Sequence, residues 1–449
     1  MEQNLTTGNV LRTIVRFSLP YLLSYFLQTL YGMADLFIIG QYEGAAATTA
    51  VSIGSQVMHM LTVMLVGLAM GTTVSIAKAV GAGDRAGAAA ATGNTVTLFA
   101  GLSAALTAVL LLLVRPIIAV MSTPSEAVQG AEQYLRICFL GIPFITAYNV
   151  ISSIFRGMGD SKRPMYFVAV ACAANIALDY LFMGVLRLGP AGAALGTTIS
   201  QAISVVISLI AVRNRNMIVL QSTDLRPKKA VLGQILRVGL PVMLQDGLIQ
   251  VSFVTITIIA NHRGLTDAAA VGIVEKIMGF LFLVPSAILS TVSALGAQNL
   301  GAGKPERAVA ALRYAIALSS GLCLLMVGIV QLTAERLVGA FTPDLLVAAA
   351  GGQYLRGYVF DCLFGSIQFS FSGYFCARSK SGLSFLHNIL SIALVRIPGA
   401  YLASRRFPQT LLPMGLASTA GSVFSVLVCL IAYAALRRKD RAVLEGDAG

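Results

Sequence analysis

The chain has 449 residues, of which 57% are hydrophobic and only 11% are charged, and its mean hydropathy is +0.81. Soluble domains carry about 25% charged residues, so this composition excludes a soluble globular protein and predicts an integral membrane protein. The formal net charge is +13, which points either to membrane topology or to an anionic partner.

Twelve transmembrane helices are predicted, because a crossing needs about 20 apolar residues. They lie near residues 14–39, 47–76, 90–114, 130–154, 164–186 and 190–212, and then near 237–259, 269–297, 309–330, 351–375, 383–404 and 412–435. The first apolar stretch is longer than the core of a signal peptide and lacks a small-residue cleavage site. We therefore expect it to stay in the mature protein.

Most of the 32 Lys and Arg residues fall in segments that are cytoplasmic if both termini lie inside, among them Arg156, Lys162 and Arg163. Short basic loops are retained in the cytoplasm, so the sequence predicts cytoplasmic termini. Basic loops beside anionic membrane lipid account for the net charge, and no nucleic-acid partner is expected.

The six cysteines all lie in hydrophobic spans without a CxxC motif, and the three histidines are scattered. Such cysteines are typical of small core residues. Since no catalytic or nucleotide-binding motif occurs either, the sequence favours neither an enzyme nor a bound cofactor.

Three sequence segments recur at an offset of about 220 residues. VRFSLP (15–20) matches LRVGLP (236–241), IAKAVGAGDRAGA (76–88) matches GAQNLGAGKPERAVA (296–310), and YLRICFLGI (134–142) matches YLRGYVFDC (354–362). The repeat predicts two six-helix bundles related by pseudo-twofold symmetry: an N-terminal lobe (1–216), a cytoplasmic linker (217–231) and a C-terminal lobe (232–449). Transporters with such parallel repeats bind cargo near the bilayer midplane between the halves.

Several motifs occur together in this duplicated arrangement. They are YGMADLFIIG, the paired loops VGAGD and LGAGK, and FRGMGDSKRPM. In combination, and over nearly the whole chain, they resemble the multidrug and toxic compound extrusion (MATE) transporters. The resemblance implies a secondary antiporter that exports lipophilic organic cations in exchange for H+ or Na+ by alternating access. We expect a monomer in a bacterial plasma membrane that handles small cationic or amphipathic substrates.

The glycine-rich loops have a structural interpretation of their own, because glycine permits tight turns between helices. We do not expect them to contact substrate.

Five carboxylates lie well inside the predicted spans, away from their ends: Asp35, Asp179, Asp246, Glu275 and Asp361. A carboxylate at a helix centre costs about 2.5 to 3.5 kcal/mol on insertion scales, so it usually faces a cavity or a partner. Each of them is a candidate functional residue.

Asn175 and Asp179 are four residues apart and so share one helix face. The MATE resemblance implies a cation site made of Asp35, Asn175, Asp179 and Thr197, with Thr198 as the neighbouring alternative. Two carboxyls in a poorly solvated pocket cannot both stay ionised cheaply, so they favour binding a proton. Oxygen ligands of this kind also suit Na+. The alternative is that these side chains only join helices by hydrogen bonds.

The second lobe departs from one branch of that family, which carries a glutamate and an aspartate where this chain has Ile249 and Gly365. Asp246 and Asp361 lie about one turn away, as shifted substitutes or as unrelated residues. The sequence therefore gives little support to a second sodium site.

Asp246, with Gln245 and Gln250, is a candidate to attract cationic cargo; alternatively, Asp246 pairs with Lys276. Glu275 and Lys276 are adjacent and are also expected to neutralise each other locally.

Tyr31, Met33 and Met64 are further candidate substrate contacts, because aromatic rings and thioethers accommodate lipophilic cations. Such residues at helical spacing are also common in ordinary cores. The alternative function is a flippase or exporter of a lipid-linked or other amphipathic metabolite. A flippase needs several buried cations to hold a diphosphate, whereas this chain has mainly Lys276 and Arg396 within its spans.

Overall fold

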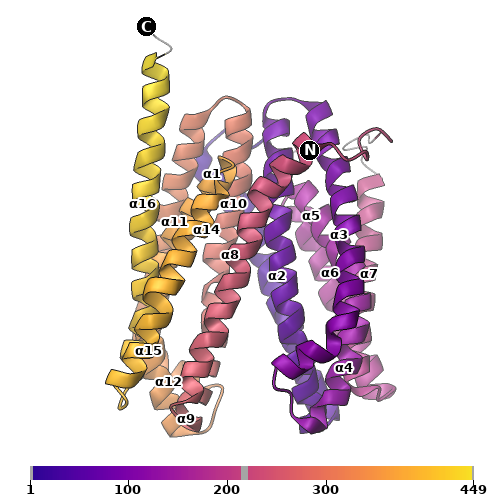
Figure 1. Cartoon of the computed structure of the whole chain (residues 1–449), viewed down its shortest axis with the longest axis vertical. Helices are drawn as coiled ribbons and strands as arrows, with labels where there is room; N and C mark the ends of the chain where they lie inside the picture. Colours follow the sequence, from indigo (N-terminus) through magenta and orange to yellow (C-terminus); the bar gives the residue numbers. More distant parts are fainter. Residues whose placement is uncertain (1–3, 214–220, 447–449) are drawn as a thin grey trace. The chain divides into compact units, whose positions relative to one another are not determined.

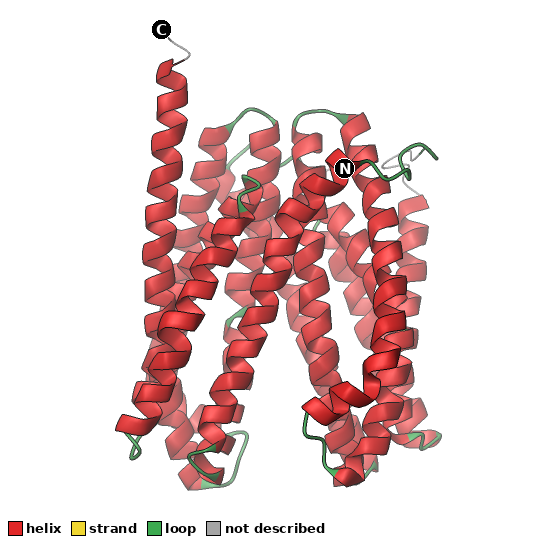
Figure 2. Cartoon of the chain, viewed as in Figure 1, coloured by secondary structure: helices red, strands yellow, loops and turns green. Residues whose placement is uncertain are grey.

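A computed structural model describes residues 4–213 and 221–446, and every regular element within these ranges is a helix (Figure 2). The expectation of an all-α membrane protein is confirmed. The chain packs as two compact units.

Unit 1 takes in Arg16–Met243, Ala297–Gly303 and the described part of Met1–Thr7. Its helices are α1 (Val10–Tyr42), α2 (Ala45–Gly81), α3 (Arg85–Val120), α4 (Ser125–Leu140), α5 (Ile142–Gly157), α6 (Lys162–Asp179), the π-helix η1 (Tyr180–Val185) and α7 (Gly189–Arg213) (Figure 1). Helix α2 packs against α3, α4, α5 and α7, and α6 packs along α7.

Unit 2 takes in Gly8–Val15, Leu244–Gly296 and the described part of Lys304–Gly449. Its helices are α8 (Lys229–Asn261), α9 (Leu265–Leu281), α10 (Leu283–Gly301), α11 (Pro305–Gly339), α12 (Leu345–Tyr358), α13 (Phe360–Ala377), α14 (Ser381–Ser391), the π-helix η2 (Ile392–Arg396), α15 (Ile397–Arg406) and α16 (Leu412–Gly446). Helices α11, α12, α13 and α16 pack around its core.

The borders of the two units fall inside α1, α8 and α10, whereas the predicted lobes end at 216 and begin at 232. The first half of α8 lies in unit 1 because it packs closely on α2. A Cβ placed on Gly71 would lie 2.1 Å from the backbone oxygen of Ile235, so the two helices meet at a backbone-to-backbone contact.

The predicted linker, 217–231, is described only from residue 221 onward. Asn94 of α3 holds this part, because its amide donates to the backbone oxygen of Asp224 at 3.1 Å and its Oδ1 accepts from the backbone N–H of Lys228 at 2.6 Å. The segment is therefore anchored to α3 in unit 1.

The twelve predicted spans all fall on helices. Within the described residues, ten helical segments are long and apolar enough to cross a membrane, and an eleventh is the pair α4 and α5, bent by 46°. The remaining predicted span, 351–375, falls on α12 and α13. The predicted spans therefore correspond to real helices, although some of them consist of two.

The glycine-rich loops are tight turns between helices, as predicted. Gly83 in VGAGD and Gly303 in LGAGK adopt φ values of +71° and +67°, a region that disfavours side chains. Beside the first turn, the Asp84 side chain accepts from the backbone N–H of Gly87 at 2.8 Å and caps α3.

Candidate functional site

The four residues of the predicted cation site lie together inside unit 1. Asp35 comes from α1, Asn175 and Asp179 from the last turns of α6, and Thr197 from α7, and each side chain is at most 4% exposed. The hydroxyl of Thr197 donates to Asp35 Oδ2 at 3.2 Å and also to the Ala193 backbone oxygen at 3.1 Å. Three helices thus converge on one buried polar cluster.

Thr198, the neighbouring alternative, points elsewhere. Its hydroxyl donates to the backbone oxygen of Ile137 at 3.5 Å and is only partly buried. The structure therefore assigns the position beside Asp35 to Thr197.

Gly196 makes room for the Asp179 carboxylate. A Cβ at this position would lie 2.1 Å from Asp179 Oδ1 and 3.6 Å from Asn175 Nδ2. Because α6 and α7 pack side by side, the carboxylate lies directly over the backbone of α7. Sequence reasoning missed Gly196, since a single glycine in a membrane helix has many explanations.

The cluster holds two carboxyls and no basic partner. Asp35 and Asp179 interact electrostatically, and Asn175 lies beside Asp35, while none of the ion pairs among the described residues involves either aspartate. Several buried atoms lack a hydrogen-bond partner there: Asp35 Oδ1, both carboxylate oxygens of Asp179, and the Asn175 oxygen and nitrogen.

Unsatisfied buried oxygens are costly and call for a ligand. The donor set of carboxylate, amide and hydroxyl oxygens fits Na+, and the paired carboxyls equally fit a shared proton.

The substrate candidates on α1 and α2 are Tyr31, Met33 and Met64. Its phenol interacts electrostatically with both Asp35 and Asp179. Met33 is 44% exposed and Met64 is half-buried. Of these three side chains, the Tyr31 phenol is thus the one that interacts electrostatically with the two carboxyls.

The polar candidates of α8 lie in unit 2. Gln245 is buried, and its Oε1 accepts from the Ser384 hydroxyl at 2.5 Å. Asp246 and Gln250 are half-buried, and Asp246 interacts electrostatically with Cys376 of α13.

The alternative in which Asp246 pairs with Lys276 is wrong, because Lys276 is exposed and no ion pair joins the two within the described residues. Glu275 does not pair with Lys276 either, because its carboxylate interacts with other side chains. Its Oε2 accepts from the Thr257 hydroxyl at 3.2 Å, and it interacts electrostatically with Arg396.

Asp361 forms a buried ion pair with Arg396, which sequence reasoning did not find. Arg396 is the last residue of η2 and also stacks near the Phe253 ring, 5.6 Å from its centroid. The guanidinium thus supplies the positive charge that a bound cation would otherwise supply to Asp361. The sequence shows that Arg396 lies inside a predicted span, but it does not indicate that Asp361 is its partner.

Both π-helices adjoin these polar clusters. Helix η1 follows Asp179 directly, and η2 ends at Arg396. Single π-turns are frequent at functional sites, and here each one lies where a charged side chain enters the interior of a unit.

A family model described as MatE matches residues 20–181 and 241–402. The two matched segments start at residues 20 and 241, so their offset agrees with that of the internal sequence repeat. Together they cover most of the chain.

Curated relatives match over nearly the full length. The chain is 29% identical over 411 residues to the probable multidrug resistance protein YpnP of Bacillus subtilis, covering 92% of each chain. It is 25% identical over 442 residues to the probable multidrug resistance protein NorM of Thermotoga maritima, covering 96% of this chain and 94% of the relative. The multidrug export protein MepA of Staphylococcus aureus is 24% identical over 408 residues, with 89% of each chain covered.

Solved structures share the fold. A crystal structure of a MATE protein in complex with MaL6 superposes with a TM-score of 0.90 at 23% identity, covering 97% of this chain and 99% of that one. A MOP superfamily transporter from Pyrococcus furiosus, described by a reverse polarity of its binding pocket, gives the same TM-score and identity over 97% and 98% of the two chains.

Proposed function

Since this chain belongs to the MatE family, whose members are transporters and not enzymes, we propose that it exports lipophilic organic cations in exchange for H+ or Na+. It is an integral membrane transporter, as its apolar helices and its family indicate. We further propose that it acts as a monomer in a bacterial plasma membrane, with both termini in the cytoplasm.

The buried pair Asp35 and Asp179 is the observation that carries this proposal. Two carboxyls without a basic partner cannot both remain ionised in a poorly solvated interior. They are therefore suited to take up one positive charge from outside the protein, either as a proton or as Na+. Among the described residues no basic group pairs with either aspartate, so uptake of that charge depends on the ion available on the accessible side of the membrane.

Coupling follows if ion binding changes the packing of α1. Asp35 is held by Thr197 of α7, and a bound ion would link α1, α6 and α7 through their side-chain oxygens. An ion that binds one conformation better than another shifts the balance between them. In transporters built from repeats, such a shift exposes the cargo site to alternate sides. The energy for export then comes from the ion gradient.

The choice of cargo rests on the curated relatives, which are named for multidrug resistance and multidrug export. Candidate cargo contacts are Tyr31 in unit 1 and Gln245, Asp246 and Gln250 in unit 2. A carboxylate and an aromatic ring both attract organic cations, and these residues provide one of each kind.

A flippase for a lipid-linked metabolite is the alternative. Such a protein needs several cationic side chains to hold a diphosphate, and the buried ones among the described residues are Arg156 and Arg396. Since Arg396 is already paired with Asp361, Arg156 is the one buried cation among the described residues that is left for a diphosphate, and a single cation is too few for that role.

The test is transport of a fluorescent lipophilic cation into everted membrane vesicles that contain the protein, under an imposed pH gradient or an imposed sodium gradient. Vesicles without the protein are the control. We expect accumulation driven by one of the two gradients. If neither gradient drives the cation, while a lipid-linked anionic substrate is translocated, the flippase alternative is correct.

A further inference from the structure

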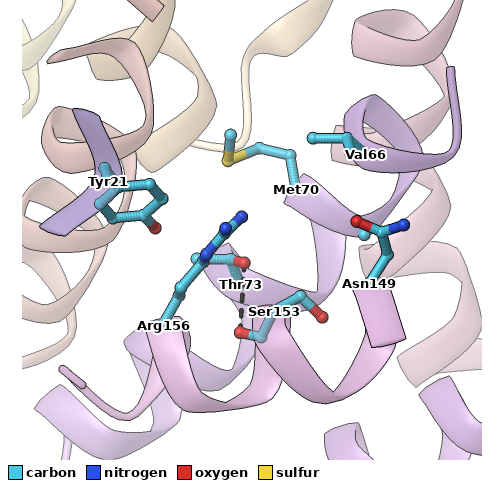
Figure 3. A pocket seen from close by; sticks show the side chains of 8 residues that line it. Tyr21, Val66, Met70, Thr73, Asn149, Ser153 and Arg156 are labelled. Atoms are coloured by element: carbon cyan, nitrogen blue, oxygen red, sulfur yellow. Dashed lines mark hydrogen bonds between the residues drawn. The ribbon is translucent and has the colours of Figure 1, made fainter. Parts of the chain in front are cut away.

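A small pocket in unit 1 lies apart from the carboxyl cluster, between α1, α2 and α5. Tyr21 of α1, Met70 and Thr73 of α2, and Ser153 and Arg156 of α5 line it (Figure 3). Figure 3 shows the Arg156 side chain extending from α5 into the space between Tyr21 and Thr73. The sequence predicts that Arg156 lies in a cytoplasmic segment, and the structure shows it in the last turn of α5, where it is only 8% exposed.

The charge of Arg156 is not balanced by any acid among the described residues. It forms no ion pair there, and its electrostatic neighbours are the tyrosines Tyr21, Tyr25 and Tyr148. Its guanidinium carbon lies 4.6 Å from the centroid of the Tyr21 ring. Attraction to an aromatic face is weaker than the cost of burying an unpaired charge, so stacking alone leaves the cation undercompensated. An arginine cannot lose its proton to escape that cost.

Three other polar groups of the pocket are already committed to the backbone. The Thr73 hydroxyl donates to the Ser153 backbone oxygen at 3.2 Å, and the Ser153 hydroxyl donates to the Val150 backbone oxygen at 2.7 Å. The Asn149 amide donates to the Ile145 backbone oxygen at 2.8 Å. The guanidinium, which carries five N–H donors, makes no hydrogen bond to any described residue. The pocket therefore has an excess of donors and of positive charge.

The size of the pocket decides what can compensate that charge. Its cavity volume is about 10 Å³, which is room for a single water-sized particle. A monoatomic halide is somewhat larger than a water molecule and needs only a small shift of the lining side chains, whereas a phosphate group or an amphipathic cargo needs a much larger one. Water fits as well, but it brings no charge.

We propose that this pocket binds one chloride-sized monovalent anion, which serves as the counter-ion of Arg156. The anion lies against the guanidinium and beside the Tyr21 ring, so it joins α5 to α1. Binding in the folded protein alone stabilises that protein by mass action. Stability should therefore rise with the concentration of a small anion, independently of the ion that couples to transport.

The test uses the purified full-length protein in detergent, with thermal unfolding followed by circular dichroism. Sodium gluconate is replaced by sodium chloride or sodium bromide at constant ionic strength, and sodium sulfate serves as the large-anion comparison. We expect the midpoint temperature to rise with chloride and bromide along a saturating curve, and not with sulfate. A midpoint that does not respond to halide in the unmodified protein would overturn the proposal.

Three variants test whether Arg156 is the residue that binds the anion. In Arg156→Gln the midpoint should no longer respond to halide, whereas Arg85→Gln, which changes an exposed arginine at the start of α3, should respond like the unmodified protein. Asp35→Asn should also keep the response, so a failure of the antiport proposal leaves this result unaffected. An equal halide response in Arg156→Gln would contradict the site.

A second measurement needs no variant. Crystals of the unmodified protein grown in bromide should show an anomalous peak beside the Arg156 guanidinium. Density for water alone at that place, without an anomalous signal, would overturn the proposal even if Arg156→Gln fails to fold.

Discussion

The Thr197 hydroxyl donates a hydrogen bond to Asp35 Oδ2 at 3.2 Å, between residues 162 positions apart in the chain. The bond joins α7 to α1 inside unit 1, next to Asn175 and Asp179 of α6. It gives the aspartate of the first helix one defined donor and leaves its other oxygen without a partner. The orientation of the Asp35 carboxyl is therefore set by α7.

Thr197→Val should change the affinity for the coupling ion while keeping the shape of the side chain, in opposite directions for the two candidate ions. Loss of a hydroxyl oxygen should weaken Na+ binding, whereas loss of the donor to the ionised Asp35 carboxyl should strengthen proton binding. A hydrogen bond to a charged group contributes about 1.5 to 3 kcal/mol, which corresponds to a roughly tenfold or larger change of affinity. The measurement is the ion concentration that gives half-maximal cation transport in vesicles. Thr198→Val is the matched control and should stay close to the unmodified protein. A larger effect in Thr198→Val would mean that the assignment of the two threonines is reversed.

Gly196→Ala should disrupt the cluster by a steric clash, without changing any charge or hydrogen-bonding group. The added methyl group would lie 2.1 Å from Asp179 Oδ1, so the carboxylate must move, at a typical overpacking cost of about 1 to 3 kcal/mol. We expect gradient-driven transport to fall strongly while the protein still inserts into the membrane. Gly101→Ala in α3, where a Cβ meets open space, is the control and should transport normally. Normal transport by Gly196→Ala would show that the position of the Asp179 carboxyl is unimportant.

The helices could be predicted because composition and spacing directly reflect the cost of burying polar backbone in lipid. The convergence of Asp35 with Asp179 was implied by family resemblance together with the spacing of Asn175 and Asp179 on one helix face. The role of these residues in ion coupling stays a prediction. The sequence thus identifies the residues that are unusual for their surroundings, such as carboxylates within apolar spans.

Pair relationships across helices could not be predicted in the same way. Asp361 and Arg396 are far apart in the chain, and neither shows a spacing that reveals the other. Arg156 looked like part of a basic loop, because its burial depends on how α5 packs against α1 and α2. Helix ends and side-chain partners are tertiary properties, and the local pattern at these positions was ambiguous.

Arg396→Gln should destabilise the protein more than Asp361→Asn does. Arg396 faces two carboxylates, Asp361 directly and Glu275 electrostatically, so its removal leaves both without a cation. Loss of Asp361 still leaves Glu275 beside the guanidinium. Breaking a buried ion pair typically costs about 3 to 5 kcal/mol, and we expect Arg396→Gln to lie in that range and Asp361→Asn below it. Thermal and denaturant unfolding in detergent measure the difference, and the opposite order would contradict the geometry.

Tyr31→Phe should change the dependence of transport on the coupling ion, because its phenol interacts electrostatically with Asp35 and Asp179. The substitution keeps the ring and removes only the hydroxyl group. Met33→Ala, two residues further along α1 and 44% exposed, should leave that dependence unchanged. The readout is the half-maximal ion concentration at saturating cargo. Equal behaviour of the two variants would remove Tyr31 from the cluster.

The most direct test of the account is transport of a fluorescent cation into everted vesicles by Asp35→Asn and Asp179→Asn, under imposed pH and sodium gradients. Glu306→Gln, which neutralises an exposed carboxylate at the start of α11, is the control, and all variants are compared at equal amounts in the membrane. The account predicts that both aspartate variants lose gradient-driven transport while the control keeps it. Normal transport by both aspartate variants under the gradient that drives the unmodified protein would contradict it.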